Sequence, residues 1–210
     1  MSKISLKHSG GNVVSLNSPT NAPGAADVAF KLPNQDGSAN EFLKTDGSGN
    51  LSFGAAGGGK FASYAIIADV KSNTTNGGTF TTGDWRVRDL QTEVADADGI
   101  VSLSNNQFTL PQAGSYFIHA RMPYMMVGFC KMKLYNVTDS SDVIQSEAGY
   151  SSTGVSANFY IDLKTRITIA SSKAFDIRMA GQVTRSSYGY GYASQFGPET
   201  YTTVVIFKES

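Results

Sequence analysis

Apolar and polar side chains alternate along the stretch Phe159-Tyr160-Ile161-Asp162-Leu163-Lys164-Thr165-Arg166-Ile167-Thr168-Ile169, and this alternation decides the fold class. Odd-numbered positions carry apolar residues or Thr, whereas even-numbered positions are mostly polar or charged. Successive side chains of a β-strand point to opposite faces of its sheet. The stretch therefore predicts a strand, or two strands with a bend, with one buried face.

The pattern recurs in shorter stretches, which are residues 115–121, 131–135, 174–179 and 203–207, and a strand at residues 64–67 is expected to open the domain. Turn-forming residues separate them, for example Gly114 and the run Ser171-Ser172-Lys173. No stretch combines a sustained helical period with helix caps. Many short strands separated by turns predict an all-β fold, an antiparallel jelly-roll sandwich.

Composition excludes several classes of function. The chain has 210 residues, of which 40% are hydrophobic, so it can form a sizeable core. Lys and Arg together number 17, and Asp and Glu together also number 17, so the formal net charge is zero. A neutral chain lacks the excess of positive charge with which proteins bind nucleic acid or an anionic membrane. Cys130 is the sole cysteine, which excludes an intramolecular disulfide framework and a thiolate metal cluster. With no apolar signal or spanning segment, we expect a soluble protein made in a cytoplasm.

Aromatic residues are distributed unevenly along the chain. Residues 1–59 contain only Phe30, Phe42 and Phe53, whereas residues 60–210 contain the other twenty aromatic residues. We expect residues 1–59 to be an extended β-rich segment that ends in a Gly/Ala-rich linker, and residues 60–210 to be a jelly-roll head domain. Because strands this short are marginal alone, partner chains are expected to supply the apolar surface that the first segment lacks.

Both parts resemble proteins of tailed-bacteriophage virions. The order of motifs at residues 64–67, 85–93, 113–116 and 204–208 resembles the trimeric jelly roll of the complement-component-1q and tumour-necrosis-factor type, in the form found in phage fibre proteins. Residues 27–53 resemble segments common in such fibres. The resemblance implies a homotrimer, an N-terminal attachment and shaft segment that contacts other virion proteins, and a distal recognition head without cofactor.

The most unusual stretch lies between two predicted strands, where Tyr188, Tyr190 and Tyr192 alternate with Gly189 and Gly191. Tyrosine offers a large amphipathic contact area with few rotatable bonds, as in antibody binding loops, and glycine is expected to keep the backbone adaptable. The three tyrosines are therefore candidate receptor-binding residues. The alternative is that they seal the interface between the subunits of a trimer.

Other motifs with possible chemistry are incomplete. Residues 54–60 spell a phosphate-binding loop but lack its hydroxyl residue and the following helix. Residues 96–99 are half of a calcium loop and read better as a turn. His119 could bind a ligand or sense pH, although such a residue is more often at a sheet surface or subunit contact. Glu147 and Glu199 have no positioned partner for glycoside hydrolysis. We therefore expect no enzymatic activity and no metal.

Trp85, the lone tryptophan, is expected to be largely buried, to anchor an early strand and to donate its indole N–H to an acceptor.

Three functions remain open at this point. The first is a non-enzymatic virion fibre protein whose head attaches to a host-surface glycan or protein, with no nucleic acid bound and no membrane insertion. The second is a capsid head fibre or decoration protein anchored by its N-terminus. The third is a virion glycan hydrolase, which would need two carboxylates about 5 to 9.5 Å apart.

Overall fold

The computed structural model describes residues 3–7, 9–11, 13–17, 29–39, 41–55 and 61–209. Contacts between Cα atoms divide the chain into two units, Met1–Gly57 and Gly58–Ser210. Most of the predicted linker at residues 54–59 lies outside the described residues, as does most of the phosphate-loop spelling at residues 54–60 and the start of the motif at residue 27. The described ranges contain no helix that is long and apolar enough to cross a membrane.

The first unit consists of two β-hairpins. Strand β1 (Lys3–Lys7) pairs with β2 (Val13–Asn17), and β3 (Glu41–Thr45) pairs with β4 (Leu51–Ala55). The turn of the second hairpin forms around Asp46, whose carboxylate accepts hydrogen bonds from the main-chain N–H of Ser48 at 2.8 Å and from the Asn50 side chain at 2.6 Å. These hydrogen bonds lower the pKa of Asp46 below its ordinary value. Local polar contacts thus define this turn.

Residues 29–39 and 41–54 contain no buried side chain. Their apolar side chains face solvent instead, with exposed fractions of 59% for Phe30, 78% for Leu32 and 61% for Phe42. Main-chain hydrogen bonds between Lys31 and the turn of the second hairpin add order without adding burial. This part of the first unit has no hydrophobic core of its own.

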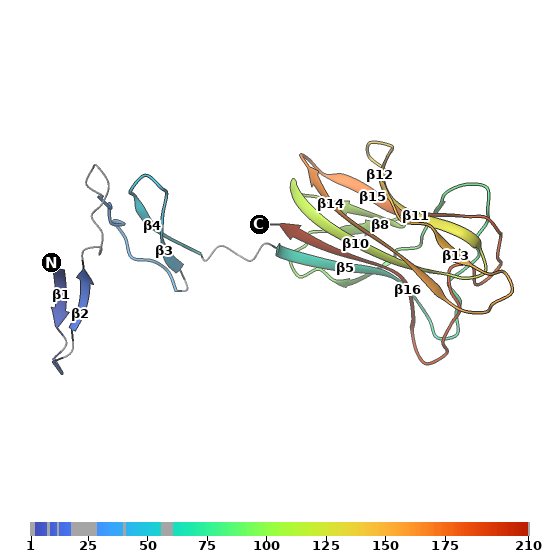
Figure 1. Cartoon of the computed structure of the whole chain (residues 1–210), viewed down its shortest axis with the longest axis horizontal. Helices are drawn as coiled ribbons and strands as arrows, with labels where there is room; N and C mark the ends of the chain where they lie inside the picture. Colours follow the sequence, from blue (N-terminus) through green and yellow to red (C-terminus); the bar gives the residue numbers. More distant parts are fainter. Residues whose placement is uncertain are drawn as a thin grey trace. The chain divides into compact units, whose positions relative to one another are not determined.

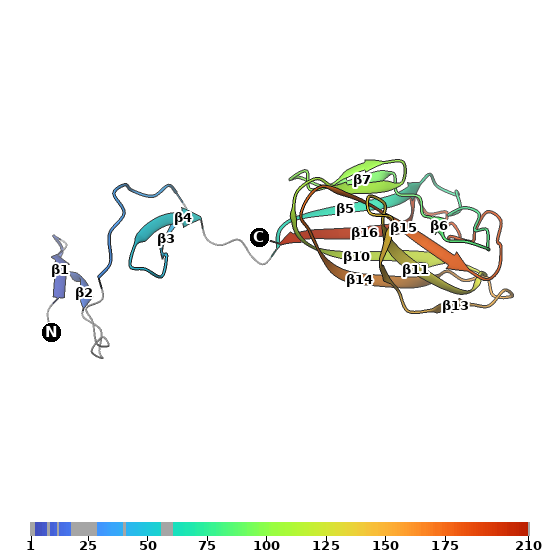
Figure 2. The same ribbon diagram turned by 90° about the horizontal axis from the view of Figure 1, so that it is seen from above.

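The second unit is a sandwich of two antiparallel sheets (Figures 1 and 2). The first sheet has the order β14 (Phe159–Ile169), β10 (Gly114–Tyr124), β16 (Glu199–Glu209), β5 (Phe61–Lys71) and β7 (Thr92–Ala95). The second has the order β12 (Ser141–Gln145), β11 (Gly128–Asn136), β15 (Lys173–Gly181), β9 (Gln107–Leu110) and β8 (Ser102–Ser104), while β13 (Gly149–Ser151) pairs with β11 and β6 (Arg86–Val87) with β15. This confirms the predicted all-β jelly-roll sandwich.

The core lies between the two sheets and follows from the alternation in the sequence. In β14, Ile161 and Leu163 are buried, whereas Asp162 and Lys164 are exposed. Strand β10 lies between β14 and β16 in the sheet and buries every second side chain over most of its length. The completely buried apolar side chains come from both sheets and include Ile67, Phe108, Tyr116, Ile118, Met122, Met132, Ile177 and Ile206.

Four connecting segments meet at one end of the head, which we call the loop end. They are residues 72–85 after β5, 125–127 between β10 and β11, 152–158 before β14, and 182–198 before β16. Strand β5 begins and β16 ends at the opposite end of the sandwich (Figure 2). The head therefore has one end where the chain enters and leaves, and one end made of loops.

Candidate recognition surface at the loop end of the head

The loop end is held together by main-chain hydrogen bonds between segments far apart in sequence. Gly77 N–H donates to the carbonyl of Gly191 at 2.9 Å, and Gly78 N–H donates to that of Ser187 at 2.9 Å. Phe80 exchanges two main-chain hydrogen bonds with Arg185, both of 2.9 Å. The segment that contains the three candidate tyrosines is thus tied along its length to residues 77–80.

Two side chains extend this network to the remaining loops. Arg185 Nε donates to the carbonyl of Met126 at 2.9 Å, and its Nη2 donates to that of Thr153 at 3.0 Å. Asn158 accepts from Tyr192 N–H at 2.7 Å and donates to the Tyr192 carbonyl at 3.0 Å. All four segments are therefore cross-linked, and a ligand that binds here meets a surface that is already ordered.

The three candidate tyrosines do not form one surface. Tyr190 is 5% exposed, and its ring packs edge-on against Phe80 with the ring centroids 5.7 Å apart. The guanidinium of Arg88 lies 3.4 Å from the centroid of the Tyr190 ring. A receptor cannot reach this side chain, so its role in the head is packing.

The structure does bring the other two tyrosines together at the surface. The rings of Tyr188 and Tyr192 meet edge to face with centroids 6.0 Å apart, and Tyr192 is 48% exposed. Phe196, four residues further on, is 96% exposed. The candidate surface therefore keeps Tyr188 and Tyr192 and gains Phe196. Whether they contact a receptor remains a prediction.

The glycines of this segment have a different role from the expected one. A Cβ atom on Gly189 would lie 2.6 Å from Cβ of Phe80, and one on Gly191 would lie 2.8 Å from the ring of Tyr201. Gly191 also has a φ of +115°, a conformation that favours glycine. The expectation that these glycines keep the loop adaptable is wrong, because they allow close packing instead.

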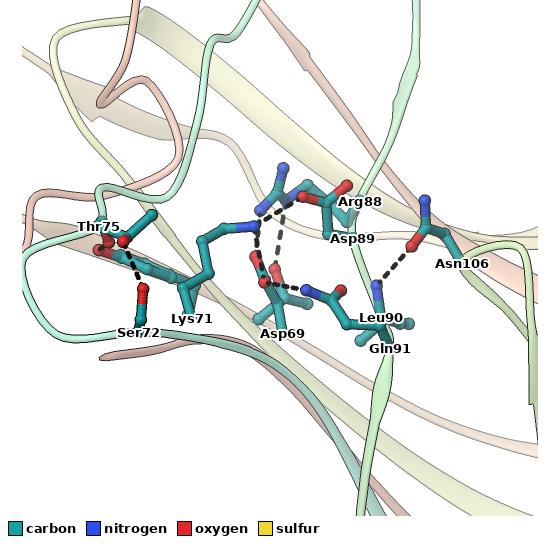
Figure 3. Close-up of polar contacts among 11 residues, drawn as sticks. Asp69, Lys71, Ser72, Thr75, Arg88, Asp89, Leu90, Gln91 and Asn106 are labelled. Atoms are coloured by element: carbon teal, nitrogen blue, oxygen red, sulfur yellow. Dashed lines mark hydrogen bonds and ion pairs between the residues drawn. The ribbon is translucent and has the colours of Figure 1, made fainter. Parts of the chain in front are cut away.

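A buried ionic network around Arg88 and Asp69 supports the loop end (Figure 3). Arg88 is 1% exposed, and it donates from Nη2 to Asp69 at 3.2 Å and from Nε to the hydroxyl of Thr202 at 3.2 Å. Lys71 Nζ bridges Asp69 at 3.0 Å and Asp89 at 2.9 Å. Burial raises the pKa of Asp69, although its hydrogen bond to Lys71 and the charges of Lys71 and Arg88 oppose that change. The network fixes the guanidinium that packs on Tyr190.

Two cavities flank residues 188–192, which we call the tyrosine segment, and the two cavities differ in charge. One has a volume of about 360 Å³, and its lining includes the ionisable side chains of Arg86, Arg88 and Asp89; we call it the charged cavity. The other has a volume of about 440 Å³ and contains no ionisable side chain except the phenol of Tyr192; we call it the uncharged cavity. Its lining is Met125, Ser156, Ala157, Asn158, Tyr192, Ala193 and Ser194.

The lone tryptophan lies directly before the short strand β6. Trp85 is only half-buried, and Lys133 Nζ lies 4.5 Å from the centroid of its ring. Trp85 follows the irregular segment at residues 72–84 rather than lying inside a core strand, and Phe129 and Gln182 line the same shallow groove. The side chain is therefore partly buried, which agrees in part with the expectation.

The remaining candidate motifs have local structural roles. Asp96 accepts from the N–H groups of Ile100 and Val101, both at 2.9 Å, as a turn residue does. His119 Nε2 lies 2.9 Å from the carboxylate of Asp162 on the neighbouring strand β14. Glu199 accepts from Gln195 N–H at 2.7 Å, which holds the loop that leads into β16. Within the described ranges, no group of three or more His, Cys, Asp or Glu side chains could hold a metal ion.

Sequence reasoning missed Asn158 and Phe196. Phe196 lies in the unusual stretch at residues 186–197 but is not among the candidate residues, and an asparagine before a strand has many possible roles. The pairing of Asn158 with Tyr192 joins residues 34 positions apart. Such a contact becomes visible only when the loops are assembled.

Comparison with known proteins identifies the fold of the head. No family model and no curated protein match the chain by sequence. Among solved structures, Eiger TNF from S. frugiperda has a TM-score of 0.50 and 13% identity, over 70% of this chain and 92% of its own. Murine APRIL at pH 5.0 has a TM-score of 0.48 and 9% identity, over 70% of this chain and 98% of its own.

The globular domain of the zebrafish complement 1qA protein has a TM-score of 0.46 and 12% identity, over 70% of this chain and 96% of its own. At such low identities a likeness concerns the fold and not the activity. The chain thus contains a jelly-roll domain that is similar in fold to Eiger TNF.

Proposed function

We propose that this chain is a non-enzymatic structural fibre protein of a phage virion, whose head attaches to the host surface through the loop end. The observation that carries the proposal is a pair of exposed aromatic side chains, Tyr192 and Phe196, on cross-linked loops. Surfaces that are aromatic and already ordered bind with a low cost in conformational entropy. The resemblance of residues 27–53 to phage fibre segments supports the virion assignment.

The proposed fibre is a homotrimer, and exposed apolar side chains in both units support self-association. Phe30, Leu32 and Phe42 face solvent in the first unit. In the head, the ring of Phe61 lies 4.9 Å from that of Phe207 and 6.3 Å from that of Phe117. This aromatic cluster extends to Tyr64, which is 51% exposed. Contiguous apolar surface of this kind marks an interaction site.

Static light scattering of the full chain tests the assembly. The proposal predicts a mass three times that of the 22.3 kDa chain. In the proposed fibre, residues 1–57 dock on other virion proteins, and three copies of the loop end contact a repeated ligand with increased avidity. A monomer at micromolar concentration would contradict this architecture.

Adsorption of the purified protein to host cells tests the attachment role. The double variant Tyr188→Ser/Tyr192→Ser should lose binding to cells while its melting temperature falls by only a few degrees, since Tyr192 is 48% exposed and Tyr188 is half-buried. Val94→Ser is the matched control, because Val94 is 56% exposed on β7, outside the loop end. Undiminished binding by the double variant would refute attachment through this surface.

A further inference from the structure

We infer that the uncharged cavity binds one uncharged pyranose unit of a surface glycan, with the ring of Tyr192 as its stacking face. This inference rests on the proposed function, because it specifies the ligand class that the loop end recognises. The cavity volume of about 440 Å³ falls within the usual range for small-molecule sites.

The walls of the cavity suit both the apolar face and the hydroxyl groups of a sugar. Tyr192 presents a half-exposed ring, and Met125, which is 3% exposed, supplies a second apolar surface. The C–H face of a pyranose packs on such surfaces, whereas its hydroxyl groups need hydrogen-bond partners at the edge. Ser156, Asn158 and Ser194 supply those polar partners from two different loops.

The polar groups retain hydrogen-bonding capacity. Asn158 uses one N–H and one oxygen lone pair on the main chain of Tyr192, which leaves its second N–H and second lone pair for a ligand. The hydroxyl of Ser194 donates to Glu199 at 3.0 Å and keeps a lone pair as an acceptor. In the described part of the chain, the Ser156 hydroxyl takes part in none of the hydrogen bonds. Together they offer donors and acceptors to neighbouring sugar hydroxyl groups.

The absence of charge on the lining selects an uncharged ligand. None of the seven lining residues carries a charge near neutral pH, so the carboxylate of an acidic sugar would lose hydration without gaining an ion pair. The charged cavity could bind such a carboxylate, because within the described ranges the side chain of Arg86 donates only to the carbonyls of Thr81 and Thr82. The charge of the bound sugar therefore distinguishes the two cavities.

The site is ordered before the ligand arrives. The hydrogen bonds of Asn158 fix Tyr192, and Ala193 N–H donates to the side chain of Asn76 at 3.0 Å. Met125 N–H donates to the carbonyl of Gly189 at 3.1 Å. No loop has to close over the sugar, so we expect weak but fast binding at each site and avidity from several copies.

Methyl NMR of the full chain with labelled methionines tests the inference. The probes are the methyl glycosides of glucose, galactose, mannose, rhamnose and N-acetylglucosamine, with methyl glucuronide as the charged match of the glucoside. At least one neutral glycoside should shift the Met125 signal and leave that of Met132 in place, because Met132 is completely buried in the core. If methyl glucoside binds, methyl glucuronide should bind at least tenfold more weakly. If methyl glucoside does not bind, methyl glucuronide should not shift the Met125 signal either.

Three variants make the test specific. Tyr192→Ala should weaken binding of the neutral glycoside about tenfold, since it removes the stacking face, and Tyr192→Phe should restore it to within about twofold. Tyr150→Ala is the matched control, because Tyr150 is a tyrosine on β13 that is 55% exposed and does not line the cavity. Its affinity should equal that of the wild type.

The outcomes separate this inference from the proposed function. If cells are bound but no neutral glycoside shifts Met125, or Tyr192→Ala binds as well as the wild type, the inference is overturned and the attachment role stands. Binding of the glucuronide that is lost in Arg86→Gln would also overturn it, in favour of the charged cavity. If the glycoside binds at Met125 but cells are not bound, the sugar site stands and the attachment role fails.

Discussion

The two units of the chain differ in the burial of their described apolar side chains. The head buries residues such as Phe108 and Phe175 completely or nearly so between its sheets, and their rings stack with centroids 5.7 Å apart. In the first unit, residues 29–39 and 41–54 bury no side chain at all. The head therefore contains the interactions that stabilise it, whereas residues 29–39 and 41–54 of the first unit have no such core.

The same contrast recurs on a smaller scale within the tyrosine segment. Tyr190 packs into the head against Phe80 and Arg88, whereas Tyr192, two residues later, presents its ring to solvent. Burial, and not residue type, decides which side chains stabilise the head and which remain available for binding. Substitutions should therefore have graded effects on the stability of the head.

The largest effect is expected for Tyr190→Ala. Removal of this ring leaves a cavity between Phe80 and the buried guanidinium of Arg88. The free energy of unfolding should fall by about 3 to 5 kcal/mol, as for other buried aromatic side chains. Denaturant unfolding monitored by tryptophan fluorescence measures the change. Tyr192→Ala should lower the free energy of unfolding by less than about 0.5 kcal/mol. Equal losses for the two variants would contradict the contrast between a buried Tyr190 and an exposed Tyr192.

A smaller loss is expected for Gly189→Ala. The new Cβ would lie 2.9 Å from the main-chain N of Phe80, which cannot move away alone because that N–H donates to Arg185. Overpacking of this kind costs about 1 to 3 kcal/mol. Gly154→Ala in another loop is the control, since its Cβ would meet only Ser152 at 4.0 Å. Unchanged unfolding of the Gly189 variant would show that the segment is adaptable after all.

A pH-dependent effect is expected for Glu199→Gln. Hydrogen bonds from the main chain of Ser194 and Gln195, and from the Ser194 hydroxyl, lower the pKa of Glu199 below its ordinary value of 4.5. The stabilisation from this carboxylate is therefore fully present above pH 4.5 and is lost as the pH falls through the lowered value. The variant should melt below the wild type at pH 7, and the difference should shrink toward pH 3. A difference that is constant with pH would contradict this role.

The smallest effect on the head is expected for Phe42→Ser in the first unit. Phe42 is 61% exposed, so the melting temperature of the head should not change. Because partner chains are proposed to cover this side chain, the mass in light scattering should fall from that of a trimer at low concentration. Ser52→Ala in the same hairpin is the control. A trimer that is equally stable in Phe42→Ser would show that these apolar residues do not join the chains.

The sequence predicted the head far better than its loop end. A strand with one buried face must alternate, so residues 159–169 and 115–121 could be assigned from their pattern and lie within β14 and β10. Loops have no such period. The burial of Tyr190 depends on Phe80, which is 110 positions away, and the placement of Trp85 depends on strand β11. Glycine between tyrosines fits both an adaptable loop and a closely packed one, and only the assembled contacts distinguish them.

The direction in which the head points on the particle tests the central claim most directly. Cryo-electron microscopy of purified virions should show density for the first unit on the particle and the loop end of the head, with Tyr192, directed away from it. A fibre on the capsid instead of the tail would retain the orientation and change only the place of attachment. A loop end that is buried against the particle, with the first unit directed outward, would contradict the account.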